Sequence, residues 1–474
     1  MHSLFTVPHA AVRARRLAGV VIVASVAGFT TAAESSATVE PTTGDQSVSV
    51  VDAIVAHATS SPDGSAAFTF LPGDFAGETR DLPIGVFDSG IGGLTVLEAI
   101  LAADDFDNRT LQPVPDGRPD FAGERFVYLG DQANMPYGNY PREGNVAFLR
   151  ELILKDAVFL LGRRSWPVAD AVAPVLDKPP VKAIVIACNT ATAYGLDDIR
   201  AAIRAWGVPV PVVGVVEAGA RGVLQSAHLA AGRDEAVAVL ATVGTCASMA
   251  YPKAIGVAFG RAGRPAPAVV QQGFADLAAA IEGDPAVAAR TSVEQAIAVD
   301  LRRLLDEQRR ASTSPPVGTL VLGCTHFPLV RRQIVAEFAR LRRLEEQGGR
   351  PFERLIAEEI EVIDPASLTA RELFRTLALE RLRSPAATAR RAAEAEPAPG
   401  VDGVQPHRFF WSVAIERAAA GTAETPSPEA TFHRAAGRLD LEDTRVVPLR
   451  ADMLPGPTVE MIRGRLPHVG RFLR

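Results

Sequence analysis

Short apolar runs alternate with helical patterns through the middle of the chain. The runs end in small or polar residues and cover 84–87, 126–129, 183–187, 210–216, 236–243 and 319–322. A helical stretch usually follows each run, and this alternation is typical of βαβ units around a mainly parallel sheet. The pattern therefore predicts an α/β fold.

One part of this pattern occurs twice. Residues 182–190 read KAIVIACNT, and residues 318–326 read GTLVLGCTH. Each segment is an expected buried strand followed by a small residue, a cysteine and two polar residues. Two similar lobes that face each other would bring these strand ends to a shared cleft, since ligands bind beyond the carboxyl ends of parallel strands. The repeat predicts two pseudo-symmetric lobes, each a mainly parallel sheet flanked by helices.

The N-terminus has a different composition. Arg13, Arg15 and Arg16 precede an uncharged, mostly apolar run that ends at Ala33, which is the pattern of a targeting segment. An upstream extension without a targeting role is the alternative.

Segments of distinct composition divide the chain. They are 1–33 as a signal-like or anchor segment, 34–80 as a linker, 81–213 as the first α/β lobe, 214–329 as the second α/β lobe, 330–383 as a return to the first lobe, 384–437 as a low-complexity insertion, and 438–474 as a C-terminal segment.

Charge and cysteine content exclude several classes of function. The 474 residues carry a net charge of −6, which gives no electrostatic footprint for nucleic acid. Three cysteines do not make a disulfide framework, and without a CxxC pair we expect no structural metal site. No GxxxxGK phosphate loop occurs, and no lysine has a setting typical of a pyridoxal Schiff base.

A glycine-rich turn follows the first expected strand. Residues 84–93 read IGVFDSGIGG, and a helix is expected to start near Leu94. Free amides at a helix start can hold an anion, whereas Asp88 would suit an ammonium group. The alternative is a plain turn in which Asp88 or Ser89 caps the helix. A dinucleotide site is disfavoured, because Thr95 stands where the third glycine of GxGxxG would be.

Two cysteines are candidates for acid/base chemistry. Cys188 precedes Asn189 and Thr190, which can cap a helix, and a helix N-terminus lowers the pKa of a thiol. Cys324 precedes Thr325 and His326. A lone cysteine in such a place is more often a small core residue, but two in matching contexts favour a functional pair.

Other polar residues at strand ends leave their roles open. His326 could support a thiolate, bind substrate, belong to a metal site or be a core histidine. Cys246 has no symmetric counterpart, so a structural role is expected. Tyr137 and Gly138 lie in a Met-Pro-Tyr-Gly loop that could close over a ligand or form an ordinary turn.

Together these motifs resemble the glutamate racemases of the aspartate/glutamate racemase superfamily. The resemblance covers about residues 83–370, and its six segments are IGVFDSGIGGLTVL, DQANMPYGNY, IVIACNTATA, VVGVVEAG, LATVGT and LVLGCTHFPLV, in that order. It implies two α/β lobes with the active site between them, and a racemase that needs no cofactor and no metal. Its substrate would be glutamate, and its product D-glutamate would serve peptidoglycan synthesis.

The resemblance also implies roles for individual residues. Cys188 would take the α-proton from the D-enantiomer and Cys324 from the L-enantiomer. Eight other positions match residues that hold substrate: Asp88, Ser89, Tyr137, Gly138, Asn189, Thr190, Thr325 and His326. Glu282 matches a family glutamate near the cleft, but the segment before it departs from the usual pattern, which leaves its role open.

Compartment and partners follow less directly. The family resemblance implies the cytoplasm, where thiols stay reduced, whereas residues 1–33 allow export or membrane tethering. We expect a small-molecule substrate, no nucleic acid, either a monomer or a homodimer, and membrane contact only through the N-terminal segment if it is retained. Two alternatives for function are a two-cysteine racemase for aspartate or a hydantoin, and an exported binding protein for acidic amino acids.

Overall fold

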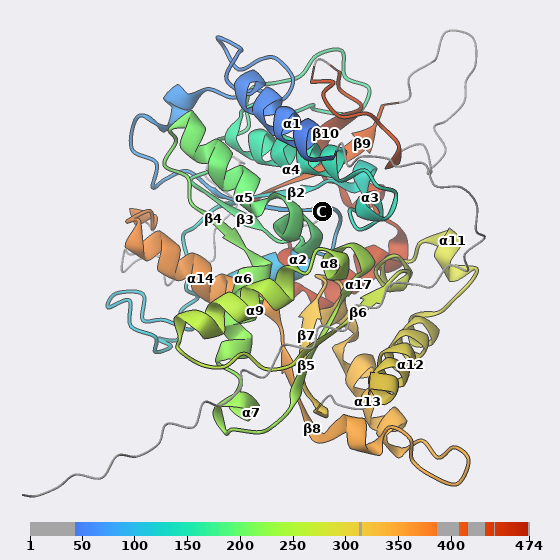
Figure 1. Ribbon diagram of the computed structural model, residues 1–474. Helices are drawn as coiled ribbons and strands as arrows, with labels where there is room; N and C mark the ends of the chain where they lie inside the picture. Colours follow the sequence, from blue (N-terminus) through green and yellow to red (C-terminus); the bar gives the residue numbers. More distant parts are fainter. Residues whose placement is uncertain (1–42, 312–314, 386–406, 416–431, 440, 473–474) are drawn as a thin grey trace, which may run out of the picture.

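The computed structural model describes residues 43–311, 315–385, 407–415, 432–439 and 441–472. The chain forms two lobes, drawn in the upper and lower halves of Figure 1, and each is built around its own sheet. The α/β fold with two mainly parallel sheets flanked by helices is therefore confirmed.

The first lobe contains a six-stranded sheet in the order β10-β9-β2-β1-β3-β4. Strand β1 lies in parallel between β2 and β3, with Gly85 opposite Val127 and Ile184. The edge strand β10 is antiparallel to β9. The strands are β1 (Ile84–Asp88), β2 (Phe126–Gly130), β3 (Ala183–Ile186), β4 (Val212–Gly214), β9 (His407–Ala414) and β10 (Thr444–Pro448).

The second lobe contains a four-stranded, all-parallel sheet in the order β6-β5-β7-β8. Its strands are β5 (Ala236–Thr242), β6 (Val269–Phe274), β7 (Val317–Gly323) and β8 (Ile356–Ile363). Helices cover both faces of both sheets, so the central strands are buried on both sides and read as continuous apolar runs.

The α-helices are α1 (Thr43–His57), α2 (Leu94–Ala102), α3 (Asn139–Arg142), α4 (Val146–Leu161), α5 (Asn189–Trp206), α6 (Val215–Leu224), α7 (Ala227–Ala230), α8 (Val243–Ala247), α9 (Ala250–Arg261), α10 (Leu277–Glu282), α11 (Pro285–Ala288), α12 (Val293–Ala311), α13 (Arg331–Arg343), α14 (Pro365–Leu379), α17 (Gly456–Arg465) and α18 (Pro467–Gly470). Helices α1, α4 and α5 share one core with the first sheet, and α2, α14, α17 and α18 share the core on its other face. Helices α10, α12 and α13 cover one face of the second sheet, while α6 and α9 cover the other. None of the described helices is long and apolar enough to cross a membrane.

The prediction of a linker over 34–80 is wrong for the residues of this range that the structure describes, 43–80. Helix α1 packs against α4 and α5, and Ile54 and Phe70 are fully buried. The Phe70 ring lies edge-on to Trp206 with 5.1 Å between ring centroids, and the Trp206 indole donates a hydrogen bond of 2.9 Å to the carbonyl of Val55. A few large apolar side chains among small polar residues are thus enough to anchor this segment.

Two further boundaries differ from the sequence expectation. The range 330–383 was expected to return to the first lobe, but β8 pairs in parallel with β7, so the second lobe extends to Ile363 and the return begins with α14. The range 384–437 was expected to be a low-complexity insertion. Its residues 407–414 form β9, a largely buried strand paired with β2, because side chains such as Phe409 and Phe410 enter the cores on opposite faces of the sheet. The signal-like segment 1–33 lies outside the described residues.

Candidate active site

The loop after β1 forms the first part of the site. The Oδ2 atom of Asp88 accepts hydrogen bonds from the amides of Gly93 at 2.8 Å and Gly90 at 3.2 Å. Its Oδ1 atom is buried without a hydrogen-bond partner among the described residues. Burial raises the pKa of Asp88, while the nearby His326 opposes that shift. A buried carboxylate oxygen with free acceptor capacity is suited to a cationic group.

Cys188 lies at the end of β3 and caps the N-terminus of α5. Its sulfur accepts a hydrogen bond from the amide of Ala191 at 3.4 Å, and its thiol donates to Ser89 Oγ at 3.9 Å. Burial, followed by the charge of Asp88, raises the pKa of Cys188 far above its ordinary value. The expectation that the helix start would lower this pKa is wrong, because removal from water outweighs the helix amides. Cys188 is therefore a neutral thiol in this structure.

Cys324 directly follows β7 and has an imidazole beside it. Its Sγ lies 3.7 Å from Nδ1 of His326, and Nε2 of His326 lies 2.6 Å from Oε1 of Glu282 at the end of α10. Burial by itself would lower the pKa of His326, but the hydrogen bonds to Cys324 and Glu282 outweigh it, and the net pKa is well above the ordinary value. The structure thus places an imidazolium between a thiol sulfur and a carboxylate.

The glycine turn after β1, which contacts Cys188 through Ser89, touches the loop that carries Cys324. Thr95 at the start of α2 donates to the carbonyl of Thr325 at 2.9 Å, which joins the glycine turn to the loop after β7. A Cβ atom on Gly92 would lie 2.3 Å from Thr325 Oγ1 and 2.5 Å from His326 Cε1. Only glycine allows this approach. The carboxyl ends of strands from both sheets therefore meet at one place.

Asn189 and Thr190 also lie at this junction. Tyr251 of α9 donates to Oδ1 of Asn189 at 2.7 Å, and Thr190 Oγ1 lies 3.0 Å from Oγ1 of Thr245 and 3.2 Å from that of Thr242. The sequence marked the turn after β5 only as a polar strand end. It gave no signal for Tyr251, because its hydrogen-bond partner Asn189 belongs to the other lobe.

Tyr137 and Gly138 differ from each other in position. The Tyr137 hydroxyl is hydrogen-bonded to the carboxyl groups of Asp131 and Asp156, so its side chain points into the first lobe and is not offered to a ligand. Gly138 instead faces the second lobe, where a Cβ atom would lie 3.2 Å from Thr242 Oγ1. The Met-Pro-Tyr-Gly loop therefore contributes its backbone to the junction.

A cavity of about 680 Å³ opens between the lobes beside these groups. Its walls include Met135 and Pro136 of the loop, Glu282 of α10 and Thr458 of α17. Glu282 lines the cavity and contacts His326, and His326 in turn contacts Cys324. Two side chains thus connect the cavity wall to the Cys324 sulfur. Glu282, whose role the sequence left open, is thus part of the site.

Within the described ranges, no group of three or more His, Cys, Asp or Glu side chains is arranged to hold a metal ion. Cys246 packs against the core between α6, α9 and the second sheet, and burial raises its pKa to about 12.

The chain is similar in sequence to known proteins. A model of the Asp/Glu/Hydantoin racemase family matches residues 162–373. A glutamate racemase of Enterococcus faecalis is 33% identical over 248 residues, which cover 52% of this chain and 68% of that protein. One of Thermus thermophilus is 32% identical over 303 residues, with 64% and 82% covered. A solved glutamate racemase of Bacillus anthracis has a TM-score of 0.44 and 26% identity, and the match covers 65% of this chain and 85% of that one. The chain therefore belongs to the glutamate racemases of the Asp/Glu racemase family, and it is an amino-acid racemase that acts on a small molecule.

Proposed function

We propose that this protein interconverts L- and D-glutamate by a two-base mechanism in which Cys188 and Cys324 exchange protons with the α-carbon. The observation that carries the proposal is the placement of the two thiols at matching strand ends of two lobes whose loops touch. Racemisation removes a proton from one face of a carbon and returns a proton to the other face. Two groups from opposite lobes meet that requirement, one entering without a proton to take the α-proton and the other entering with a proton to give to the opposite face.

The surroundings of the two sulfurs differ. Cys188 is a buried neutral thiol beside Asp88, so it is ready to give a proton when L-glutamate is the substrate. Cys324 faces the imidazolium of His326, which can donate to a thiolate. With L-glutamate, the Cys324 thiolate takes the α-proton and the Cys188 thiol gives its proton to the opposite face. The D-enantiomer reverses both transfers.

Substrate binding is proposed to use the groups around the sulfurs. The free Oδ1 of Asp88 would accept a hydrogen bond from the substrate ammonium. Amides and hydroxyls at the loop ends, from Ser89, Asn189, Thr190, Thr325 and the backbone of Tyr137 and Gly138, would hold the carboxylates. Fixed donors of this kind stabilise the negative charge that develops as the α-proton leaves, and they do so best where water is excluded.

The cellular role is proposed from the product. D-Glutamate would supply peptidoglycan synthesis, and the cytoplasm would provide both its consumers and a reducing environment for the two thiols. A homodimer remains part of the proposal, and any membrane contact would run through residues 1–33.

Exchange of the α-proton into ²H₂O tests the proposal. The protein is incubated with D-glutamate, L-glutamate or aspartate, and loss of the α-proton signal is followed by NMR together with optical rotation. We expect exchange and racemisation with glutamate alone. Exchange with aspartate alone would mean that the substrate is aspartate and not glutamate. Absence of exchange with all three amino acids would support a binding protein instead.

Three single cysteine variants test the mechanism. Cys188→Ala and Cys324→Ala should each abolish racemisation, because each removes one of the two proton carriers. Cys246→Ala makes the same chemical change at a thiol outside the site and should remain active. Racemisation that survives in either of the first two variants would refute the two-base mechanism.

A further inference from the structure

A tyrosine hydroxyl is held between two buried carboxyl groups in the first lobe. The Tyr137 hydroxyl lies 2.5 Å from Oδ2 of Asp131, which follows β2, and 2.6 Å from Oδ2 of Asp156 in α4. All three side chains are buried, with exposed fractions of 1%, 3% and 6% for Tyr137, Asp131 and Asp156.

Proton counting shows that one of the two carboxyl groups is protonated. A phenol has a single hydrogen and can donate it to one of its two neighbours. The contact with the other carboxyl is also at hydrogen-bond distance, so the hydrogen of that bond must come from the carboxyl. Two ionised carboxylates would leave one of the two contacts as a pair of facing acceptors without a hydrogen.

The surrounding groups place this proton on Asp156. Asp131 accepts hydrogen bonds on both oxygens, from Ser412 Oγ at 2.6 Å and from Asn134 Nδ2 at 2.8 and 2.9 Å, in addition to the phenol. Burial raises the pKa of Asp131, but the donors to both of its oxygens and the nearby Arg434 oppose that shift and favour its ionised form over that of Asp156. Asp156 has Tyr137 as its hydrogen-bond partner among the described residues. Burial, and then the charge of Asp131, raise the pKa of Asp156 well above its ordinary value.

The tyrosine held in this way sets the position of the loop that reaches the other lobe. Gly138 is the next residue, and a Cβ atom on Gly244 of α8 would lie 2.8 Å from the Gly138 carbonyl oxygen. Gly138 also faces Thr242, which contacts Thr190 next to Cys188. The side chain of Tyr137 is thus the anchor in the first lobe for backbone that lies against the second lobe at the site.

We propose that Asp156 is a positioning residue for substrate binding: as a neutral acid it donates a hydrogen bond to Tyr137 and so fixes the Tyr137–Gly138 backbone at the active site. The effect on substrate rests on the proposed function, whereas the protonation of Asp156 does not. Because the loop would hold substrate and the sulfurs would carry out the proton transfers, loss of this hydrogen bond raises KM and leaves kcat nearly unchanged.

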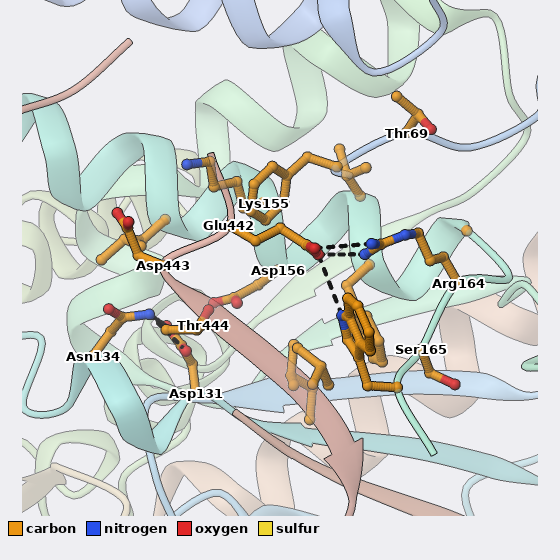
Figure 2. Close-up of a pocket in the computed structure, with 18 of the residues that line it drawn as sticks. Thr69, Asp131, Asn134, Lys155, Asp156, Arg164, Ser165, Glu442, Asp443 and Thr444 are labelled. Carbon is orange, nitrogen blue, oxygen red and sulfur yellow. Dashed lines mark hydrogen bonds and ion pairs between the residues drawn. The ribbon is translucent and has the colours of Figure 1, made fainter. Parts of the chain in front are cut away.

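Solvent can exchange the proton in question. A cavity of about 60 Å³ lies next to these groups, and its lining includes Asp131, Asn134, Lys155 and Asp156. Figure 2 shows Asp131, Asn134 and Asp156 on one side of this pocket and the Arg164–Glu442 ion pair on another. A space of this size holds a few water molecules. The acid proton of Asp156 is therefore expected to be replaced by deuterium in ²H₂O without unfolding.

Infrared difference spectroscopy tests the protonation directly. The spectrum of wild type minus Asp156→Asn should contain the carbonyl stretching band of a protonated carboxylic acid, and this band should shift in ²H₂O. Asp198→Asn is the matched control, since Asp198 is ion-paired with Arg150 and its loss should remove only carboxylate bands. A difference spectrum of the Asp156 variant with carboxylate bands alone would overturn the proposal, whether or not the protein racemises glutamate.

Kinetics test the positioning role. Asn at position 156 keeps an N–H donor for the phenol oxygen, so Asp156→Asn should show KM and kcat within about twofold of wild type. Leu has no donor, so Asp156→Leu should raise KM for glutamate about tenfold with little change in kcat. Equal KM values in the Asn and Leu variants would overturn the positioning role. A wild-type protein without racemase activity would instead refute the proposed function, and the infrared result would stand by itself.

Discussion

The Glu282–His326 contact gives the sharpest test of how Cys324 is activated. Glu282→Gln keeps the size of the side chain and an oxygen acceptor but removes the negative charge. The contact is 2.6 Å long, and the side chains are 11% and 5% exposed, so little water screens it. A hydrogen bond to a charged group contributes about 1.5–3 kcal/mol, roughly twice a neutral one. The variant therefore loses about 1–1.5 kcal/mol, which is about a tenfold fall in kcat/KM.

The fall must be the same in both directions of the reaction. The two enantiomers of glutamate have equal free energy, so their equilibrium constant is one and kcat/KM for L→D equals that for D→L in any variant. The difference between directions is expected in the deuterium isotope effect. Cys324 is the group that takes the α-proton from L-glutamate. Transfer of this proton to Cys324 therefore becomes more rate-limiting in Glu282→Gln. The isotope effect with α-deuterated L-glutamate should exceed that with the D-enantiomer.

The pH dependence has a defined sign as well. The raised pKa of His326 keeps the imidazolium at neutral pH, and it is lost as pH rises through that pKa. Without the charge of Glu282, burial of His326 lowers this pKa, so activity should begin to fall at lower pH than in wild type. Initial rates by circular dichroism over a pH series measure this, with Glu346→Gln at an exposed ion pair as control. Unchanged pH dependence and equal isotope effects for the two enantiomers would refute the assigned role of Glu282.

Three further predictions follow from the packing. Gly92→Ala should lower kcat/KM at least about tenfold with a folded protein by circular dichroism, because its Cβ would lie 2.3 Å from Thr325 Oγ1 beside His326; wild-type kinetics would contradict this contact. Burial lowers the pKa of His407 to about 4, so between about pH 6.5 and 4 the unfolded chain binds a proton that the native chain lacks, and stability should fall by about 3 kcal/mol as pH is lowered. Urea unfolding of wild type and His407→Leu across that range measures this loss, which should be absent from the variant. Phe70→Ala should cost about 3–5 kcal/mol in the same assay, whereas a true linker residue would cost almost nothing.

Sequence patterns predicted the elements that are buried on both faces. The apolar runs that became β1, β3 and β7 were evident because no solvent-facing position interrupts them, and their polar ends marked Asp88, Cys188 and Cys324. Strand β9 was missed because it lies within a range rich in Ala, Arg, Glu and Pro, so local composition outweighed eight residues of strand pattern. Helix α1 was missed for a similar reason, since its segment shows no lasting periodicity.

Side-chain direction and protonation were not predictable in the same way. Tyr137 was expected at the substrate, but its hydroxyl turns to Asp131 and Asp156, which lie on separate elements of the first lobe. The pKa of Cys188 was expected to fall at a helix start, but burial dominates, because Cys188 lies in the core that α4 and α5 form with the first sheet.

The sequence by itself determined the α/β class, the two cysteines at equivalent strand ends and the glycine turn after the first strand, because these depend on local patterns of burial and backbone freedom. Only the tertiary structure decided that Glu282 contacts the imidazole beside Cys324 and that Asp156 contacts the Tyr137 hydroxyl. Those contacts join residues far apart in the chain, and their energies depend on the exclusion of water where the elements meet. Local sequence specifies neither of these quantities.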